Sequence, residues 1–146
     1  MRRHFTILIA DRNRHVREFL QRELLAEGYR VELAKDDREV LAMIEAEIPP
    51  DLLILDLELP CGGGVELLER LQDRKSQVPV LIHSFLPENG NHPALRGTAG
   101  FVEKCGDNIN PFKTTVSEVL RKWYPRRFAP EEHDEIAAAT DRLQAG

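Results

Sequence analysis

The sequence predicts an α/β protein with a doubly wound, five-stranded parallel sheet and helices on both faces. Short apolar segments alternate with longer amphipathic ones, which is the pattern of parallel strands joined by helical crossovers. The most apolar segment, 52–57, shows no alternation of polar and apolar residues, so we expect it to be buried on both faces. A length of 146 residues leaves room for one such domain.

The expected strands are short and rich in isoleucine, leucine and valine. The second alternates polar and apolar residues, and the first and third are almost continuously apolar. The five strands are expected over 5–10, 30–34, 52–57, 78–84 and 100–104.

The expected helices begin at polar residues and end near glycine or proline. The first opens at Asn13 or Arg14 and stops before Gly28. The other four are expected over 36–44, 65–71, 87–95 and 112–123. The fourth contains Gly90 and Pro93, so it is expected to be short or irregular.

Composition argues against several classes of function. The net charge of −5 disfavours nucleic-acid binding by this chain alone, because a generic nucleic-acid surface is basic. No apolar run approaches the roughly 20 residues of a spanning helix, so no membrane insertion is expected. Asp11 interrupts the apolar start, which is therefore expected to be a strand of a cytoplasmic protein rather than a signal peptide. Cys61 and Cys105 have neither disulfide nor metal-site spacing.

Polar residues end four of the five expected strands. They are Asp11, Asp56, Ser84 and Lys104. Functional groups of such sheets gather beyond the carboxyl ends of the strands. The sequence therefore predicts one sheet edge with two carboxylates, a hydroxyl and an ammonium.

These four groups suit one kind of chemistry. Two carboxylates that lie close together favour a cation between them, and Mg²⁺ prefers oxygen ligands. A carboxylate can also attack phosphorus and form an aspartyl phosphate, whose charge a metal, a lysine and a hydroxyl would balance.

The sequence resembles the receiver domains of bacterial two-component response regulators, which have a flavodoxin-like fold. The resemblance covers about 6 to 123. It is carried by PDLLILDLELP at 50–60, GVELL at 64–68, PVLIHS at 79–84 and GTAGFVEK at 97–104. Each segment alone is weak, and their common order and spacing make the match specific.

The resemblance implies that Asp56 is the phosphoacceptor. Mg²⁺ would be held by Asp11, Asp56 and the backbone carbonyl of Glu58. Ser84 and Lys104 would contact the phosphoryl group, and Phe101 would be the switch aromatic. Two conformations in equilibrium would then be re-weighted by one covalent charge.

Three residues depart from the family pattern. Arg12 stands where a second acidic residue usually binds the metal, so Mg²⁺ affinity and phosphotransfer are expected to fall. Glu58 has two open roles: it pairs with Arg12, or it partly replaces the lost carboxylate. Phe85 stands where a small residue is usual and is expected to crowd the site, and Cys105 replaces the usual proline after Lys104.

Each site residue also has a plainer interpretation. Asp56 would be a helix cap or a buried, hydrogen-bonded carboxylate, and Asp11 a cap for the first helix. Ser84 would be a strand-end hydroxyl, Lys104 a solvated lysine, and Phe101 a core residue. A core role and a switch role for Phe101 are compatible.

Three functions follow in order of preference. The first is a receiver at 1–124, phosphorylated by a histidine kinase or phosphotransfer protein and acting through an unknown partner or a homodimer. It is no enzyme beyond self-phosphotransfer and autodephosphorylation. The second is a pseudo-receiver that signals by binding alone, and the third is a phosphatase with an aspartate nucleophile. The extension 125–146 is expected to form at most a short helix and no effector domain.

Overall fold

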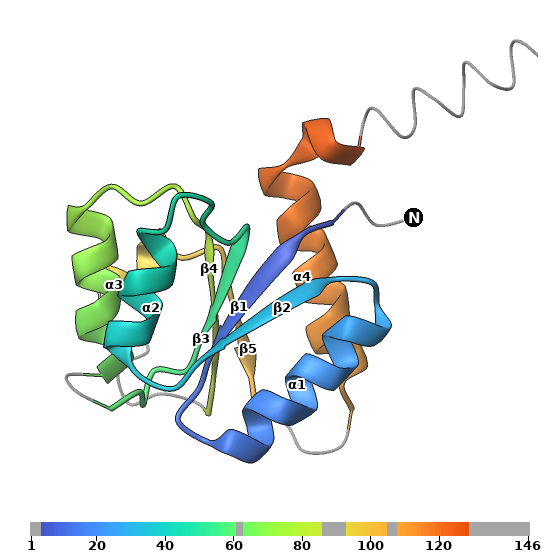
Figure 1. The fold of residues 1–146 in the computed structure, drawn as a ribbon, viewed down its shortest axis with the longest axis horizontal. Coiled ribbons are helices and arrows are strands. Elements are labelled where there is room, and N and C mark those ends of the chain that lie inside the picture. The colour runs from blue at the N-terminus through green and yellow to red at the C-terminus, as the bar shows by residue number, and fades with distance from the viewer. Residues whose placement is uncertain (1–3, 61–62, 86–92, 105–107, 129–146) are drawn as a thin grey trace, which may run out of the picture.

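A computed structural model describes residues 4–60, 63–85, 93–104 and 108–128, which form one five-stranded, all-parallel sheet (Figure 1). The strand order is β2-β1-β3-β4-β5, so the chain winds outward from β1 in both directions. The strands are β1 Thr6–Ala10, β2 Arg30–Ala34, β3 Leu52–Leu55, β4 Val80–Ser84 and β5 Gly100–Glu103. The expected fold class is confirmed.

Helices cover both faces of this sheet (Figure 1). They are α1 Arg14–Ala26, α2 Asp37–Ile44, α3 Gly63–Asp73, the 3₁₀ helix η1 Pro93–Gly97, and α4 Asn110–Trp123. Helices α1 and α4 lie on one face, and α2, α3 and η1 on the other. In this part of the chain a 3₁₀ turn stands where the sequence predicts a short or irregular helix, and residues 86–92 lie outside the described residues.

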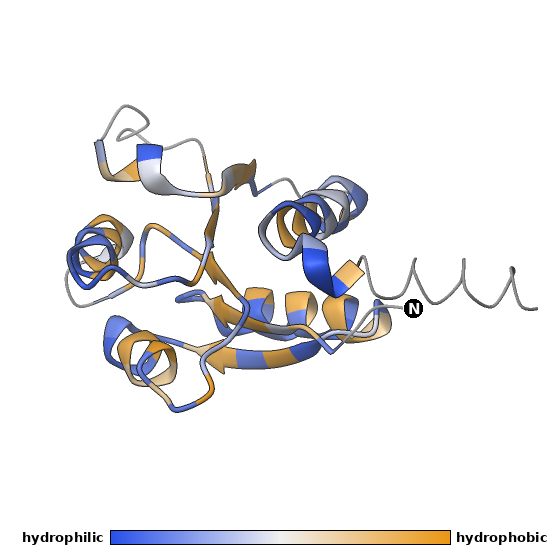
Figure 2. Cartoon of the chain, turned by 90° about the horizontal axis from the view of Figure 1, so that it is seen from above, coloured by the Kyte–Doolittle hydropathy of each residue, from blue (hydrophilic) through white to orange (hydrophobic). Residues whose placement is uncertain are grey.

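The central strands belong to two separate cores. In β1, Ile7 and Ile9 pack with α1 and α4, whereas Leu8 and Ala10 pack with α2 and α3. Figure 2 shows mostly hydrophobic central strands between helices that carry both hydrophobic and hydrophilic residues. Burial on both faces explains why β1 and β3 are apolar at every position.

Local signals set the ends of the first two helices as expected. The Asn13 side chain accepts hydrogen bonds from two backbone N–H groups in the first turn of α1. Gly28 follows α1 with a φ of +93°, a conformation that favours glycine. The Asp36 carboxylate caps α2 by accepting from the Glu39 N–H.

The expectation that Phe101 belongs to the core is wrong, because its side chain is 40% exposed. Strand β5 lies at the edge of the sheet and pairs only with β4. Its residues alternate in burial, with Val102 packed against the core shared with α4 and Phe101 exposed.

The residues that follow α4 are anchored to the start of the sheet. The Tyr124 hydroxyl donates to the Asp51 carbonyl at 2.6 Å, and an Arg127 nitrogen lies 2.8 Å from Asp51 Oδ1. The ring of Phe128 stacks on Phe5 with centroids 5.5 Å apart. Of the expected extension, residues 125–128 thus pack on the domain, and 129–146 lie outside the described residues.

Among the described residues, no helix has the length and apolar character needed to cross a membrane.

Candidate functional site

The two central strands bring Asp11 and Asp56 together. Ala10 of β1 is in register with Leu55 of β3, and the Asp56 N–H donates to the Ala10 carbonyl at 2.9 Å. Each aspartate follows its strand by one residue, so both lie at the same edge of the sheet. Both side chains are buried, with 1% of each residue exposed. Two buried carboxylates at one edge need compensating charge.

Lys104 supplies that charge from the end of β5, two strands away from β3 at the same edge of the sheet. It follows β5, and its Nζ lies 2.8 Å from Asp11 Oδ2 and 3.5 Å from Asp56 Oδ1. Its backbone N–H donates to the Ser84 carbonyl at 2.8 Å, which extends the β4–β5 ladder by one residue. The lysine side chain is only 11% exposed. The interpretation of Lys104 as a solvated lysine is therefore wrong.

Backbone N–H groups hold the Asp56 carboxylate from both sides. The Arg12 N–H lies 3.3 Å from Oδ2, and the Glu58 N–H lies 3.0 Å from Oδ1. Asp56 is thus a buried carboxylate that, within the described part of the chain, accepts hydrogen bonds from two loop N–H groups. Its orientation is set by two loops, one after β1 and one after β3.

Gly64 lets α3 approach the backbone next to Asp56. Its N–H donates to the Leu57 carbonyl at 2.9 Å. A Cβ at this position would lie 2.6 Å from the Leu57 Cα and 2.8 Å from the Asp56 carbonyl oxygen. Only glycine fits this contact without a shift of the loop that carries the carboxylate.

Asp11 is held by contacts that the sequence did not reveal. Its Oδ1 accepts from the Asn13 N–H at 2.8 Å, and its carbonyl oxygen accepts from Arg17 Nη1 at 2.6 Å. Burial raises the pKa of Asp11, and the hydrogen bond from Lys104 opposes this rise. Asn13 caps α1, so the interpretation of Asp11 as the cap is wrong. Arg17 has no periodic or motif signal that would have marked it.

Arg12 and Glu58 form an ion pair across the mouth of the site. Arg12 Nη2 lies 2.5 Å from Glu58 Oε2, and the two side chains are 50% and 46% exposed. Of the two roles left open for Glu58, the structure shows the pairing with Arg12. Both residues also donate a backbone N–H to Asp56, so the pair directly flanks the buried carboxylate.

Ser84 and Phe85 complete this edge of the sheet. Ser84 ends β4 and is 2% exposed. Phe85 is 56% exposed, and its ring centroid lies 5.6 Å from Lys104 Nζ, within the range of a cation–π contact. Cys105 lies outside the described residues.

His83, immediately before Ser84, is a buried histidine that faces α4. It is 8% exposed, and its ring lies 5.0 Å from that of Phe112 in α4. Its Nδ1 is buried and has no hydrogen-bond partner among the residues that the structure describes. Burial, reinforced by the charge of Lys104, lowers the pKa of His83 to about 4.

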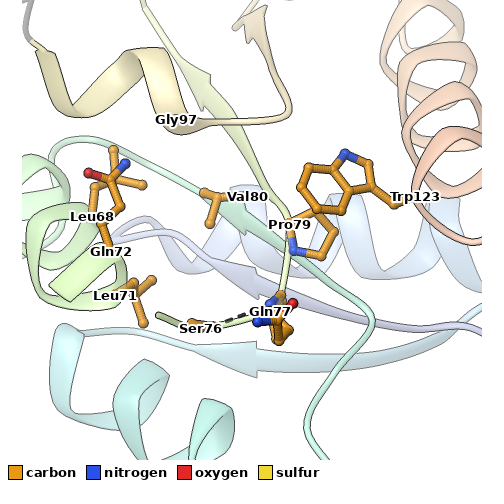
Figure 3. A pocket seen from close by; sticks show the side chains of 10 residues that line it. Leu68, Leu71, Gln72, Ser76, Gln77, Pro79, Val80, Gly97 and Trp123 are labelled. Atoms are coloured by element: carbon orange, nitrogen blue, oxygen red, sulfur yellow. Dashed lines mark hydrogen bonds between the residues drawn. The ribbon is translucent and has the colours of Figure 1, made fainter. Parts of the chain in front are cut away.

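A separate pocket has the wrong chemistry for a catalytic or phosphoryl-binding site. It lies by the start of β4, between α3, η1 and the indole of Trp123 (Figure 3). Its lining residues are apolar or uncharged, namely Leu68, Leu71, Gln72, Ser76, Gln77, Val78, Pro79, Val80, Gly97 and Trp123. The cluster of Asp11, Asp56 and Lys104 lies at the opposite edge of the sheet, where the strands end.

The chain is similar in sequence to known response regulators. Proteins named response regulator MprA from Mycobacterium avium and from Mycobacterium sp. (strain KMS) are 33% and 41% identical to the chain over 136 residues. These alignments cover 92% of the chain and 57% and 56% of the two relatives. The chain thus spans a little over half the length of these relatives.

Solved structures resemble the chain over most of the described fold. The response regulator TrrA from Thermotoga maritima, in complex with Mg²⁺-BeF, has a TM-score of 0.73 at 26% identity, covering 80% of this chain and 99% of its own. TrrA in complex with the histidine kinase ThkA gives a TM-score of 0.71 at 26% identity, covering 80% and 98%. The model of the response regulator receiver domain matches residues 7–109, so the chain belongs to that family of two-component signalling domains.

Proposed function

We propose that the chain accepts a phosphoryl group on Asp56 and signals through altered contacts with other proteins. One observation carries this proposal: the Lys104 ammonium lies between two buried carboxylates, at 2.8 Å from Asp11 and 3.5 Å from Asp56. A buried carboxylate beside a fixed cation is suited to become an acyl phosphate, whose extra negative charge the cation offsets.

The chemistry needs one nucleophile and a donor. An Asp56 oxygen attacks the phosphorus of an acyl phosphate or a phosphohistidine. A bond forms between that oxygen and phosphorus, and the bond from phosphorus to the leaving group breaks with its electron pair. The N–H groups of Arg12 and Glu58 orient the attacking carboxylate, and Lys104 balances charge on the phosphoryl oxygens.

The residues fit a weakly held Mg²⁺. Asp11, Asp56 and the backbone carbonyl of Glu58 would supply its protein ligands, because magnesium is commonly held by one or two carboxylates and several waters. When bound, the ion would neutralise charge on the phosphoryl oxygens. The Arg12 guanidinium beside the site lowers the expected affinity. TrrA, the structural relative solved with Mg²⁺-BeF, supports this assignment.

The output is a change in protein contacts. Ser84, buried at the end of β4, would turn its hydroxyl toward the phosphoryl group, and Phe101, now 40% exposed, would rotate inward. This would remodel the surface formed by β5 and α4. A histidine kinase or phosphotransfer protein would donate the phosphoryl group. The complex of the structural relative TrrA with the histidine kinase ThkA supports this assignment. The acceptor of the signal would be another protein or a second copy of the chain.

The test is incubation of the purified chain with acetyl phosphate and Mg²⁺, followed by intact mass spectrometry. One added phosphoryl group is expected, and Asp56→Asn should abolish it. Asp51→Asn is the matched control, because Asp51 is an aspartate before β3 that contacts Thr6 and Arg127 at the other edge of the sheet. A folded wild-type protein that takes up no phosphoryl group would overturn the proposal.

The Arg12–Glu58 pair also favours a second candidate, a pseudo-receiver that binds its partner without phosphorylation. The pair lies beside the Asp56 carboxylate, and the Phe85 ring lies 5.6 Å from Lys104 Nζ. In that case the partner would bind wild type and Asp56→Asn with the same affinity, with or without acetyl phosphate.

A further inference from the structure

Arg12 contacts the site twice, through its backbone N–H to Asp56 and through its guanidinium to Glu58. We propose that its guanidinium leaves Glu58 for the phosphoryl group on Asp56, and so supplies from within the chain part of the positive charge that a divalent ion otherwise brings. This inference rests on the proposed phosphorylation of Asp56. It predicts that the chain accepts a phosphoryl group with a weak requirement for Mg²⁺.

The backbone places Arg12 at the carboxylate. The Arg12 N–H donates to Asp56 Oδ2 and the Glu58 N–H donates to Oδ1. Both side chains therefore start from residues that touch the reacting group, and their charged ends meet at 2.5 Å. A phosphoryl group added to Asp56 would lie next to this pair.

Charge decides which partner the guanidinium prefers. Asp11 and Asp56 carry two negative charges, Lys104 offsets one, and the Arg12–Glu58 pair is neutral. A phosphoryl group carries a charge of about −1.5 to −2 and three strong acceptor oxygens. Arginine binds such groups through two parallel hydrogen bonds, whereas a half-exposed ion pair with a carboxylate is weak. The exchange of Glu58 for phosphate is therefore favourable.

The neighbouring cations already have contacts with buried groups of the site. Lys104 is shared between the two aspartates, and Arg17 donates to the Asp11 carbonyl at 2.6 Å. The partner of Arg12, by contrast, is a solvent-exposed glutamate that water can replace. Release of Glu58 would also remove the ion pair that joins the loop after β3 to the loop after β1. Phosphorylation would therefore change the conformation of both loops.

The experiment measures aspartyl phosphate formation from acetyl phosphate, by intact mass, across a Mg²⁺ titration and in EDTA. Wild type should form the adduct in EDTA. Arg12→Gln, which keeps the length but removes the charge, should slow this metal-free reaction at least roughly tenfold. Glu58→Gln should speed it several-fold, because Arg12 is no longer held. A purely structural ion pair would make both variants slower, so the opposite signs are diagnostic.

Arg12→Asp provides the matched comparison. It restores an acidic residue, so it should bind Mg²⁺ more tightly than wild type in calorimetric titrations of the unphosphorylated protein, and its adduct should form only with Mg²⁺. An adduct that forms with Mg²⁺, vanishes in EDTA and is unaffected by Arg12→Gln would overturn this inference and leave the proposed function intact. No adduct in any variant would overturn both.

Discussion

Lys104 Nζ lies 2.8 Å from Asp11 Oδ2, although the two residues belong to opposite ends of the domain sequence. The contact crosses from the end of β5 to the end of β1, over β3 and β4. It is formed in a nearly water-free place, because Asp11 is 1% exposed and the lysine side chain 11%. Its removal should therefore affect both stability and chemistry.

Replacing Lys104 by methionine keeps most of the stem and removes the ammonium. Asp11 and Asp56 would then be buried without a cation, so we expect the free energy of unfolding to fall by about 3 kcal/mol at pH 7, measured by urea denaturation. Arg14→Met is the control, because Arg14 pairs with Glu18 through side chains that are 78% and 52% exposed, and its loss should be far smaller. Equal effects of the two variants would show that Lys104 does not offset the charge of the two buried aspartates.

Asp11→Asn should stabilise the protein at neutral pH. Burial raises the pKa of Asp11 above its ordinary value of 3.8, so the folded state binds the proton more tightly than the unfolded state. Stability from this group is present below about pH 4 and is lost as pH rises through the raised pKa. Asparagine stays neutral, so the variant should be more stable than wild type at pH 7 and differ little from it at pH 4. A variant less stable than wild type at pH 7 would argue against this account.

His83 should make the fold sensitive to acid. Its pKa falls from 6.5 to about 4 in the folded state, so between these values the unfolded state binds more protons. Stability is therefore lost as pH falls from 6.5 toward 4, by up to roughly 3 kcal/mol. His83→Leu should remove this component in urea titrations at successive pH values, whereas His15→Gln, at an exposed histidine of α1, should leave it. If His83→Leu loses as much stability as wild type between pH 6.5 and pH 4, His83 is not the source of the acid sensitivity.

Gly64→Ala should disturb the site through the backbone. The new Cβ would lie 2.8 Å from the Asp56 carbonyl oxygen, so the loop must shift, at about 2 kcal/mol in stability. Adduct formation with acetyl phosphate should slow several-fold. Gly28→Ala has open space and strains only a positive φ, so it should lose about 1 kcal/mol with no effect on the adduct. The same adduct rate in both variants would show that Gly64 does not position Asp56.

Much of the fold and part of the site could be predicted because they depend on local patterns. Apolar segments and caps place the elements, and parallel strands end at one edge. The meeting of Asp11, Asp56 and Lys104 therefore followed from three strand ends, and the described contacts confirm it. The exposure of Phe101 could not be predicted, because the sequence does not show that its strand lies at the edge of the sheet.

The sequence by itself determined the order of elements and the residues that end each strand, because hydrophobic period and capping are properties of short segments. Only the tertiary structure decided which polar side chains contact each other or the backbone. These contacts are those of Arg12 with Glu58, of Arg17 with the Asp11 carbonyl, and of Tyr124 and Arg127 with Asp51. These contacts join polar side chains that have several possible partners and no repeating spacing. Their choice depends on the packing of loops and helix ends, which no local pattern specifies.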